Sequence, residues 1–237
     1  MKIWNVLLLS LTPFYVFAQN NLGPRLTAMG NNGAAVTDVW SLQANPSGIT
    51  SLDKPTVSLN YIKHLFSNEI STQALVAVVP VKNNFFGASF QRYGFSEYHE
   101  SKSGLAYAKK FGNKLSFALN GNYHQLKIAN YGSSTGFSVD VGGLYQFNNE
   151  FTFGVSVSNL SRQKFNSTTV FIEIPTSFNV GAGYLVSNKV IIATTVNKTL
   201  NRPIDVGLGI DYKIIDLFSL RGGLSARPFK QYAGFGL

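Results

Sequence analysis

The side chains of this sequence best suited to acid–base chemistry are its three histidines, His64, His99 and His124. A hydrolase of the serine type needs such a histidine in reach of a serine and of an acid or amide. His124 is the best placed, because three suitable side chains fall on the same parity of its strand: Ser116, Asn120 and Asn122. The competing interpretation is a solvated histidine on a polar strand face. We favour the second interpretation and expect that the chain is not an enzyme.

The sequence contains no motif typical of a metal site or a cofactor-binding site. The spacing of the histidines fits no metal motif, and a chain without cysteine has no thiolate ligands. Gly-x-Gly sequences occur at Gly181–Gly183 and Gly207–Gly209, but close packing within strands accounts for them without a nucleotide. We therefore expect neither a metal nor a cofactor.

Five polar side chains are predicted to line an interior. They are His124, Asp140, Asp205, Asp211 and Arg221. Each falls on the parity of its strand that carries small and polar residues, so they would share one face. The four charged residues could form an interior charge network, but the preferred interpretation is ordinary filling of a wet interior.

The secondary structure that positions these residues can be predicted from the sequence pattern, which is clearest in residues 136–160, GFSVDVGGLYQFNNEFTFGVSVSNL. From Phe137 to Phe147 large apolar residues alternate with small or polar ones, and after Asn148-Asn149 the alternation starts again. Side chains of a strand point to opposite faces in turn. The stretch therefore predicts two strands joined by a tight turn.

The same reading along the chain predicts about twelve antiparallel strands. They cover residues 55–64, 69–81, 84–93, 101–111, 114–127, 136–147, 150–158, 176–186, 189–198, 203–213, 217–225 and 231–237. Two-residue turns are expected at 111–114, 147–150 and 186–189, and longer links at 94–100, 128–135 and 159–175. Alternating short turns and long loops are typical of bacterial outer-membrane barrels.

Composition, strand length and the positions of aromatic residues favour a barrel over a soluble β-sandwich. Charged residues make up 13% of the 237 residues, about half the usual share, while aromatics reach 14%. Strands of about ten residues suit a tilted crossing of the hydrocarbon layer. Six rings lie at strand ends, as in an interfacial girdle: Phe111, Tyr145, Phe147, Phe151, Tyr184 and Tyr212. We predict a barrel over residues 55–237 with its large apolar face towards lipid, and keep the sandwich as the alternative.

The first residues, 1–18, predict a cleaved signal peptide. Lys2 precedes an apolar run from Val6 to Phe17, and Ala18 is a small residue at the expected cleavage point. The alternative is an N-terminal anchor, which the short run disfavours.

The formal net charge of +9 is scattered along the chain and indicates anionic lipid or lipopolysaccharide as partners rather than nucleic acid.

Residues 19–54 lack the strand pattern. A short helix is expected over Ala34–Leu42, followed by a turn at Asn45-Pro46-Ser47-Gly48 in which Gly48 would take positive φ. The segment is either a linker or a plug that enters the barrel from the periplasmic end.

At this segment the sequence resembles the PorV/PorQ-like family of outer-membrane proteins, which are related to FadL-type transporters. The resemblance rests on Gly23-Pro24-Arg25, Ala28-Met29-Gly30, Gly33, Ala34, Asp38 and Asn45-Pro46-Ser47-Gly48. It continues more generally through residues 105–112 and 220–223. In that family this arrangement forms an N-terminal hatch, so the resemblance assigns hatch roles to Met29, Gly30, Asp38, Asn45, Pro46 and Gly48.

The resemblance implies the outer membrane of a Bacteroidetes-type bacterium and a barrel of about fourteen strands. Residues 232–237 are short for a crossing and lack a terminal aromatic, so a closing hairpin is expected to be missing. Some members of the family belong to the type IX secretion machinery. The leading expectation is a docking component of protein export or surface attachment that meets secretion-machinery proteins. A channel for small hydrophobic molecules is the first alternative, and an enzyme at the barrel rim the second.

Overall fold

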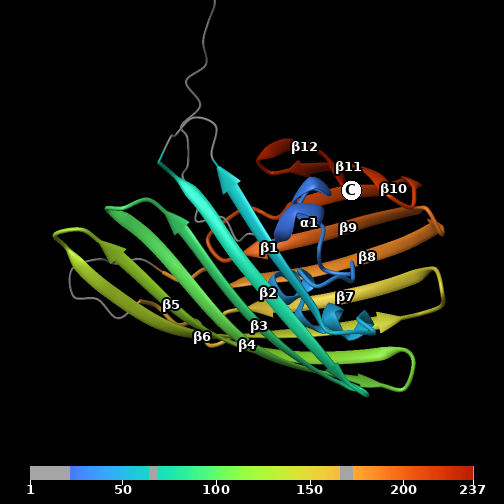
Figure 1. The fold of residues 1–237 in the computed structure, drawn as a ribbon, viewed down its shortest axis with the longest axis horizontal. Helices are drawn as coiled ribbons and strands as arrows, with labels where there is room; N and C mark the ends of the chain where they lie inside the picture. Colours follow the sequence, from blue (N-terminus) through green and yellow to red (C-terminus); the bar gives the residue numbers. More distant parts are fainter. Residues whose placement is uncertain (1–21, 64–68, 166–172, 237) are drawn as a thin grey trace, which may run out of the picture.

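The computed structural model describes residues 22–63, 69–165 and 173–236. Within these ranges the chain forms one antiparallel sheet of twelve strands, in which every strand pairs with its neighbours along the sequence (Figure 1). β1 and β12 are the two edges of the sheet in the described residues. The predicted signal peptide and His64 lie outside the described residues.

All twelve predicted strands are confirmed. Their bounds are β1 Thr56–Lys63, β2 Ser71–Val81, β3 Asn84–Gly94, β4 Tyr98–Phe111, β5 Leu115–Ile128, β6 Gly132–Gln146, β7 Phe151–Ser158, β8 Ser177–Ser187, β9 Val190–Thr199, β10 Asp205–Ile215, β11 Phe218–Ala226 and β12 Phe229–Gly236. None of the helices in the described ranges has the length and apolar character needed to span a membrane.

Two of the three predicted long links are wrong. β4 begins at Tyr98, which pairs with Ile128, and β6 begins at Gly132, which pairs with the same Ile128. The ladder hydrogen bonds therefore continue where the sequence pattern fades, and the connections shrink to residues 95–97 and 129–131. The third link, between Ser158 and Ser177, is long as predicted. We call the end with turns 82–83, 112–114, 147–150, 188–189 and 216–217 the short-turn end, and the opposite end the long-loop end.

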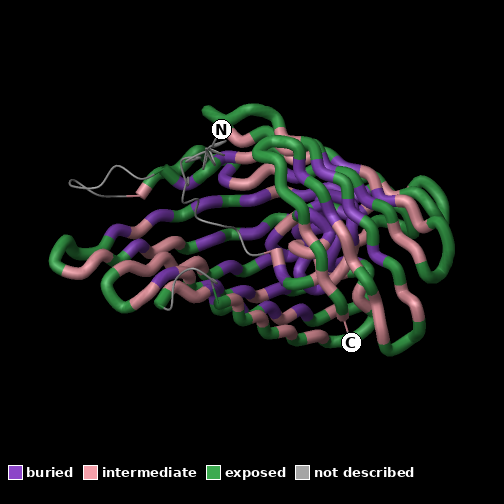
Figure 2. Tube along the Cα trace, turned by 90° about the horizontal axis from the view of Figure 1, so that it is seen from above, coloured by how far each residue is buried: buried purple, intermediate pink, exposed green. Residues whose placement is uncertain are grey.

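The large apolar side chains lie on the outside of the sheet. Leu105 is 75% exposed and Phe117 51%, whereas the inward Asn120 is 0% exposed. Figure 2 shows exposed and buried segments alternating along the strands. A soluble sandwich would bury its bulky face against a second sheet. The exposed apolar face instead matches a barrel wall that meets lipid.

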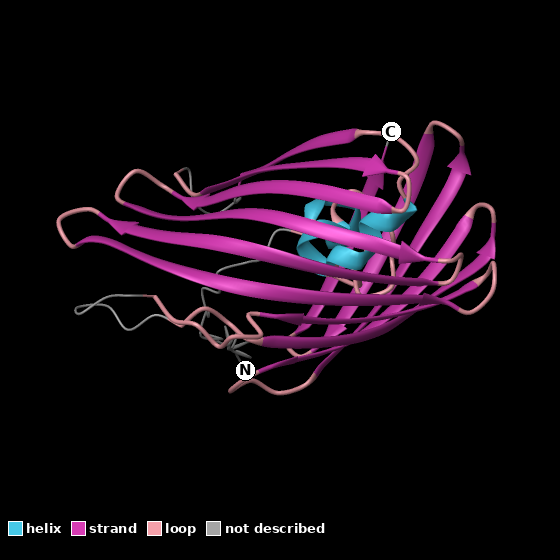
Figure 3. Ribbon diagram, turned by 90° about the horizontal axis from the view of Figure 1, so that it is seen from below, coloured by secondary structure: helices cyan, strands magenta, loops and turns pink. Residues whose placement is uncertain are grey.

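The residues ahead of β1 fold inside the curved sheet (Figure 3). They form α1 (Gly23–Ala28), α2 (Ser41–Ala44) and the 3-10 helix η1 (Pro46–Ser51). We call residues 22–52 the hatch. Its apolar side chains pack against small and aliphatic residues of the wall, and the main members of this core are Leu26, Met29, Trp40, Leu42, Ile49, Ala74, Val76, Val78, Ala106 and Ala108.

Two local predictions for the hatch are wrong. The helix predicted over Ala34–Leu42 is absent, because Ser41 binds its own loop: its hydroxyl donates to the carbonyl of Val36 and accepts from the amide of Asp38. Gly48 does not take positive φ. Its lack of a side chain matters for packing instead, since a Cβ there would lie 2.7 Å from that of Ser41.

The hatch contacts both halves of the wall. Gly87, Gly142 and Gly154 lie in the halves of β3, β6 and β7 closest to the short turns, whereas Gly207 and Gly209 lie in the half of β10 closest to the long loops. Within the described residues the hatch therefore spans the middle of the barrel interior.

Candidate functional site

An ion network joins the hatch to the wall. Arg25 of α1 donates from Nε to Oδ2 of Asp211 at 2.8 Å, and Arg221 donates from Nε to Oδ1 of the same carboxylate at 3.2 Å. Asp38 lies 3.6 Å from Arg25 Nη1. The three side chains around Asp211 are 22% exposed or less, so this is a largely buried contact between segments far apart in sequence.

Asn45 is the second anchor of the hatch. Its side-chain amide donates to the carbonyl of Ala34 at 2.6 Å and to that of Gly143 at 3.1 Å. Its oxygen accepts from the amide and the hydroxyl of Ser47. The proline at position 46 starts η1, where a missing N–H costs nothing. One buried asparagine thus holds the hatch loop, the start of η1 and strand β6 together.

Glycines of the wall admit the hatch backbone. A Cβ added at Gly154 would lie 1.8 Å from the carbonyl oxygen of Ala34, and one at Gly209 would lie 2.3 Å from that of Met29. Gly30, at φ +75°, lies against the backbone of Leu224. The wall glycines that a Cβ would bring within 3.0 Å of the hatch are Gly87, Gly142, Gly154, Gly181, Gly207, Gly209, Gly223 and Gly234. They come from seven strands, so the sheet is shaped around the hatch.

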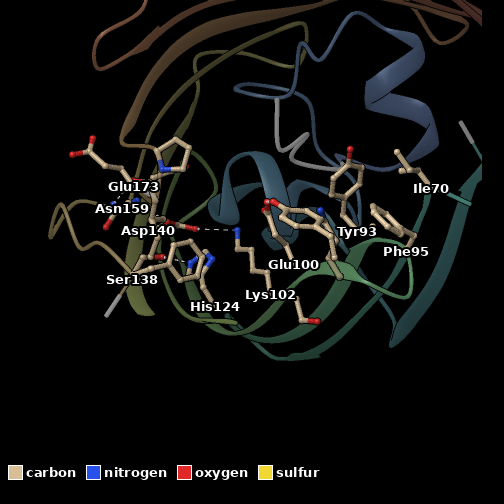
Figure 4. Close-up of a pocket in the computed structure, with 18 of the residues that line it drawn as sticks. Ile70, Tyr93, Phe95, Glu100, Lys102, His124, Ser138, Asp140, Asn159 and Glu173 are labelled. Carbon is tan, nitrogen blue, oxygen red and sulfur yellow. Dashed lines mark hydrogen bonds and ion pairs between the residues drawn. The ribbon is translucent and has the colours of Figure 1, made fainter. Parts of the chain in front are cut away.

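Beyond the hatch a cavity of about 410 Å³ opens towards the long-loop end (Figure 4). We call it the outer cavity. Its apolar and aromatic lining residues are Ile70, Tyr93, Phe95, Tyr98, Phe165 and Ile174, of which Ile70, Tyr93 and Phe95 lie together on one side. Its polar lining residues include Glu100, Lys102, His124, Ser138 and Asp140. An apolar wall with a few polar groups is the usual construction of a ligand site.

The polar side of the outer cavity is held by strands β4, β5 and β6. Lys102 Nζ lies 3.8 Å from Oδ2 of Asp140 and 3.4 Å from Oε1 of Gln43, so it also contacts the hatch. Asp140 accepts from Nδ2 of Asn122 at 2.7 Å and from the amide of Asn159 at 2.8 Å. Tyr98 donates its hydroxyl to Glu100. The carboxylates of the cavity thus have partners of their own.

His124 pairs with a different serine from those on its own strand. Its Nε2 lies 2.8 Å from Oγ of Ser138 on β6, and its ring meets Phe165 edge-on. Ser116 instead accepts a hydrogen bond from Thr50 of the hatch. The geometry gives a histidine–serine pair, while the nearby Asp140 bonds to other groups.

The four charged residues do not form the single network that was the less favoured of the two interpretations. Asp211 pairs directly with Arg221 and with Arg25 of the hatch, and Asp140 lies with Lys102 at the outer cavity. Asp205 is elsewhere again: it accepts from the hydroxyl of Ser225 and from the amides of residues 226 and 227, and so holds the turn before β12. The hatch segment divides the interior, which separates charges that share one strand parity.

Sequence reasoning gave no site role to Arg25 or Lys102. Lys102 could have been found, because it falls on the inward parity of β4 and pairs across the ladder with His124. The partner of Arg25 is 186 residues away and has no local signal. Among the described residues no group of three or more histidines and carboxylates is placed to hold a metal ion.

Solved structures with the same fold are hydrocarbon channels. The chain matches a TodX monoaromatic hydrocarbon channel mutant with a TM-score of 0.70 at 11% identity, covering 93% of this chain and 84% of that one. It matches the CymD monoaromatic hydrocarbon channel with a TM-score of 0.68 at 14% identity, covering 92% and 89%. The toluene transporter TodX of Pseudomonas putida gives 0.64 at 10% identity, covering 89% and 83%. At such identities the likeness shows the fold, an outer-membrane β-barrel.

No curated protein matches the chain. The family model for the type IX secretion system membrane protein PorP/SprF matches residues 41–236, which include Asn45, Pro46 and Gly48 of the hatch. The predicted link to type IX secretion and to the bacterial outer membrane is confirmed, while the matching model carries the name PorP/SprF rather than PorV/PorQ. This chain belongs to the PorP/SprF family of type IX secretion system membrane proteins.

Proposed function

We propose that this protein is a non-enzymatic docking component of type IX protein secretion or surface attachment in the outer membrane. The observation that carries the proposal is a hatch anchored inside a barrel of the PorP/SprF family. Arg25, Asn45 and the wall glycines fix the hatch at several independent points. A barrel built around its plug is suited to hold partners on its two ends more than to pass large cargo through its centre.

The partners of such a component follow from its surfaces. The exposed apolar belt, with Leu59, Leu105 and Phe137 among its members, is solvated by the lipid of the outer membrane. Basic residues at the long-loop end, such as Lys63, Lys127 and Arg162, suit the phosphates of lipopolysaccharide. Secretion-machinery proteins would bind the ends of the barrel, which lipid does not cover. A PorV/PorQ-like role in the attachment of exported proteins is the finer form of this proposal.

The experiment is a deletion of the coding region with complementation in the native bacterium. Proteins exported by the type IX pathway are counted in the medium and on the cell surface. We expect them to be lost from one or both locations and restored by the wild-type chain. Unchanged export and surface display in the deletion strain would refute a role in this pathway.

A second candidate function is a channel for small hydrophobic molecules. The aromatic side of the outer cavity favours it, together with a fold shared with proteins described as hydrocarbon channels. Toluene uptake by cells with and without the protein tests it directly. Equal uptake by the two strains would leave docking as the supported function.

The proposal includes the absence of enzymatic activity. The pair of His124 and Ser138 is the arrangement closest to a hydrolase in the described residues. A catalytic histidine needs an orienting partner, and Asp140 is committed to Asn122 and Asn159. Lipid composition and ester hydrolysis are expected to be the same for the wild type and for Ser138→Ala.

A further inference from the structure

The outer face of strands β3, β4 and β5 changes from apolar to basic as these strands approach the long-loop end. Residues two apart on a strand share a face, so the change can be followed rung by rung along the ladder. From the apolar belt outwards, three successive rungs are Phe90, Ser103 and Tyr123, then Arg92, Ser101 and Gln125, then Gly94, His99 and Lys127. Two cations therefore lie just beyond a rung that carries exposed aromatic rings.

These cations face away from the barrel interior. Their neighbours of opposite parity, Tyr93 on β3 and Glu100 on β4, line the outer cavity, whereas Arg92, His99 and Lys127 do not. Arg92 and Lys127 are exposed. We call Arg92, His99 and Lys127 the basic patch.

The basic patch is compact. Lys127 lies directly opposite His99 across the ladder, and the charges that act on His99 are those of Arg92 and Lys127. Two strand spacings of about 4.8 Å and an offset of two residues put the Cα atoms of Arg92 and Lys127 about 12 Å apart. Both side chains are long, so their cationic ends can converge on one anion above His99.

Neither cation of the patch has an acidic partner. All eleven Asp and Glu residues lie within the described ranges, and none of the ion pairs there involves Arg92 or Lys127. Glu97, in the turn between β3 and β4, accepts from the hydroxyl of Ser96. The patch therefore presents two positive charges that the protein itself leaves unpaired.

The height of the patch on the barrel places it beside lipid headgroups. Lys109 and His99 are outward residues near the two ends of β4, with the exposed Leu105 and Tyr107 between them. At about 3.4 Å per residue and a strand tilt of about 40°, they lie about 26 Å apart along the membrane normal. The apolar band of such barrels is about 25 Å tall. The basic patch thus borders the belt at the long-loop end, which faces the cell exterior.

We propose that Arg92 and Lys127, on either side of His99, bind a phosphate of lipid A, the membrane anchor of lipopolysaccharide. A phosphate monoester carries about −1.5 to −2 charges at pH 7, which matches two unpaired cations better than the single charge of a phospholipid diester does. Arginine binds phosphate through two parallel hydrogen bonds and lysine as a point charge. The acyl chains would then lie along the aromatic rings of Phe90 and Tyr123.

This inference rests on the lipopolysaccharide contact in the proposed function and gives that contact a site. It does not depend on the role in secretion, because lipid binding is measured on purified protein without export. Failure of the lipid experiment would therefore leave the result of the deletion experiment unchanged.

The experiment is native mass spectrometry of the whole protein in a zwitterionic detergent. Three lipids are titrated: diphosphoryl lipid A, the same lipid A after chemical removal of its phosphates, and phosphatidylglycerol. We expect one molecule of diphosphoryl lipid A to bind about tenfold more tightly than either of the other two lipids. Equal binding of the phosphate-free form, or of phosphatidylglycerol, would overturn the proposal.

Matched variants locate the phosphate. The double variant Arg92→Gln with Lys127→Gln is expected to weaken binding of diphosphoryl lipid A about tenfold, whereas Arg92→Lys with Lys127→Arg keeps both charges and should retain binding. Lys198→Gln is the control, since Lys198 is an exposed cation near the long-loop end of β9, away from the patch. Gel mobility with and without heating checks that each variant folds. Binding equal to wild type in the glutamine double variant, equal loss in both double variants, or an equal loss in Lys198→Gln would overturn the proposal.

Discussion

Asp211 on β10 accepts a hydrogen bond from Arg25 of the hatch at 2.8 Å, across 186 residues of sequence. The same carboxylate also pairs with Arg221 on β11. One carboxylate therefore pairs with two guanidinium groups, one on the hatch and one on the wall, and Asp38, 3.6 Å from Arg25, supplies the second negative charge. The contact ties the position of the hatch to the assembly of the last strands.

Replacing this acid should loosen the whole molecule. Asp211→Asn leaves Arg221 largely buried without its carboxylate and leaves Arg25 with Asp38 alone, and breaking a buried pair in this way costs about 3–5 kcal/mol. We expect a clear fall in the temperature at which the folded barrel loses its compact mobility on a denaturing gel. Asp216→Asn is the control, because Asp216 is 99% exposed in its pair with Lys213 and such exposed pairs contribute little to stability. An equal effect of the two substitutions would show that the network does not hold the hatch.

Asn45 should be required to keep the hatch in place. Asn45→Ala removes its hydrogen bonds to Ala34, Gly143 and Ser47 and leaves buried groups unpaired, at about 1–3 kcal/mol each. The expected result is more frequent channel opening in planar bilayers than for the wild type. Asn113→Ala, in an exposed short turn, should leave the conductance unchanged. Identical recordings for Asn45→Ala and wild type would mean that other contacts suffice.

A single methyl group on the wall should displace the hatch. In Gly154→Ala the new Cβ would lie 1.8 Å from the carbonyl oxygen of Ala34, so the loop must move. Gly121→Ala is the matched control, since a Cβ there meets nothing within 4 Å. Limited proteolysis should cut the hatch segment faster in Gly154→Ala only. Equal cleavage rates in both variants would contradict the observed contact.

A charged side chain on the lipid-facing belt should lower the free energy of unfolding, whereas one in the lumen should not. Leu105→Lys places an ammonium group on an apolar surface that is 75% exposed, and near the bilayer midplane this costs about 2–4 kcal/mol. Ser158→Lys, on the inward parity of β7 at the outer cavity, is the comparison. Unfolding in lipid vesicles should show a large loss of stability for Leu105→Lys alone. A comparable loss for both would argue that the belt does not face lipid.

The strands could be predicted because each has its own local pattern. In residues 115–123 large residues alternate with small or polar ones except at Gly121, and this period identifies both the strand and its outward face. The hatch could not be predicted in the same way. The loop from Ala34 to Trp40 depends on the hydroxyl of Ser41 and on wall glycines more than a hundred residues away. Parity placed Asp140 and Asp211 on one face correctly, yet it could not show that the hatch lies between them.

The most direct test of the account asks which parity of a strand touches lipid. The chain has no cysteine, so single cysteines at successive positions 115–121 can each carry a spin label. In lipid vesicles we predict that labels at Leu115, Phe117, Leu119 and Gly121 collide with oxygen dissolved in the bilayer, while labels at Ser116, Ala118 and Asn120 do not. A reversed alternation, or odd positions closed to both oxygen and water-soluble relaxers as in a packed sandwich core, would contradict the barrel and everything built on it.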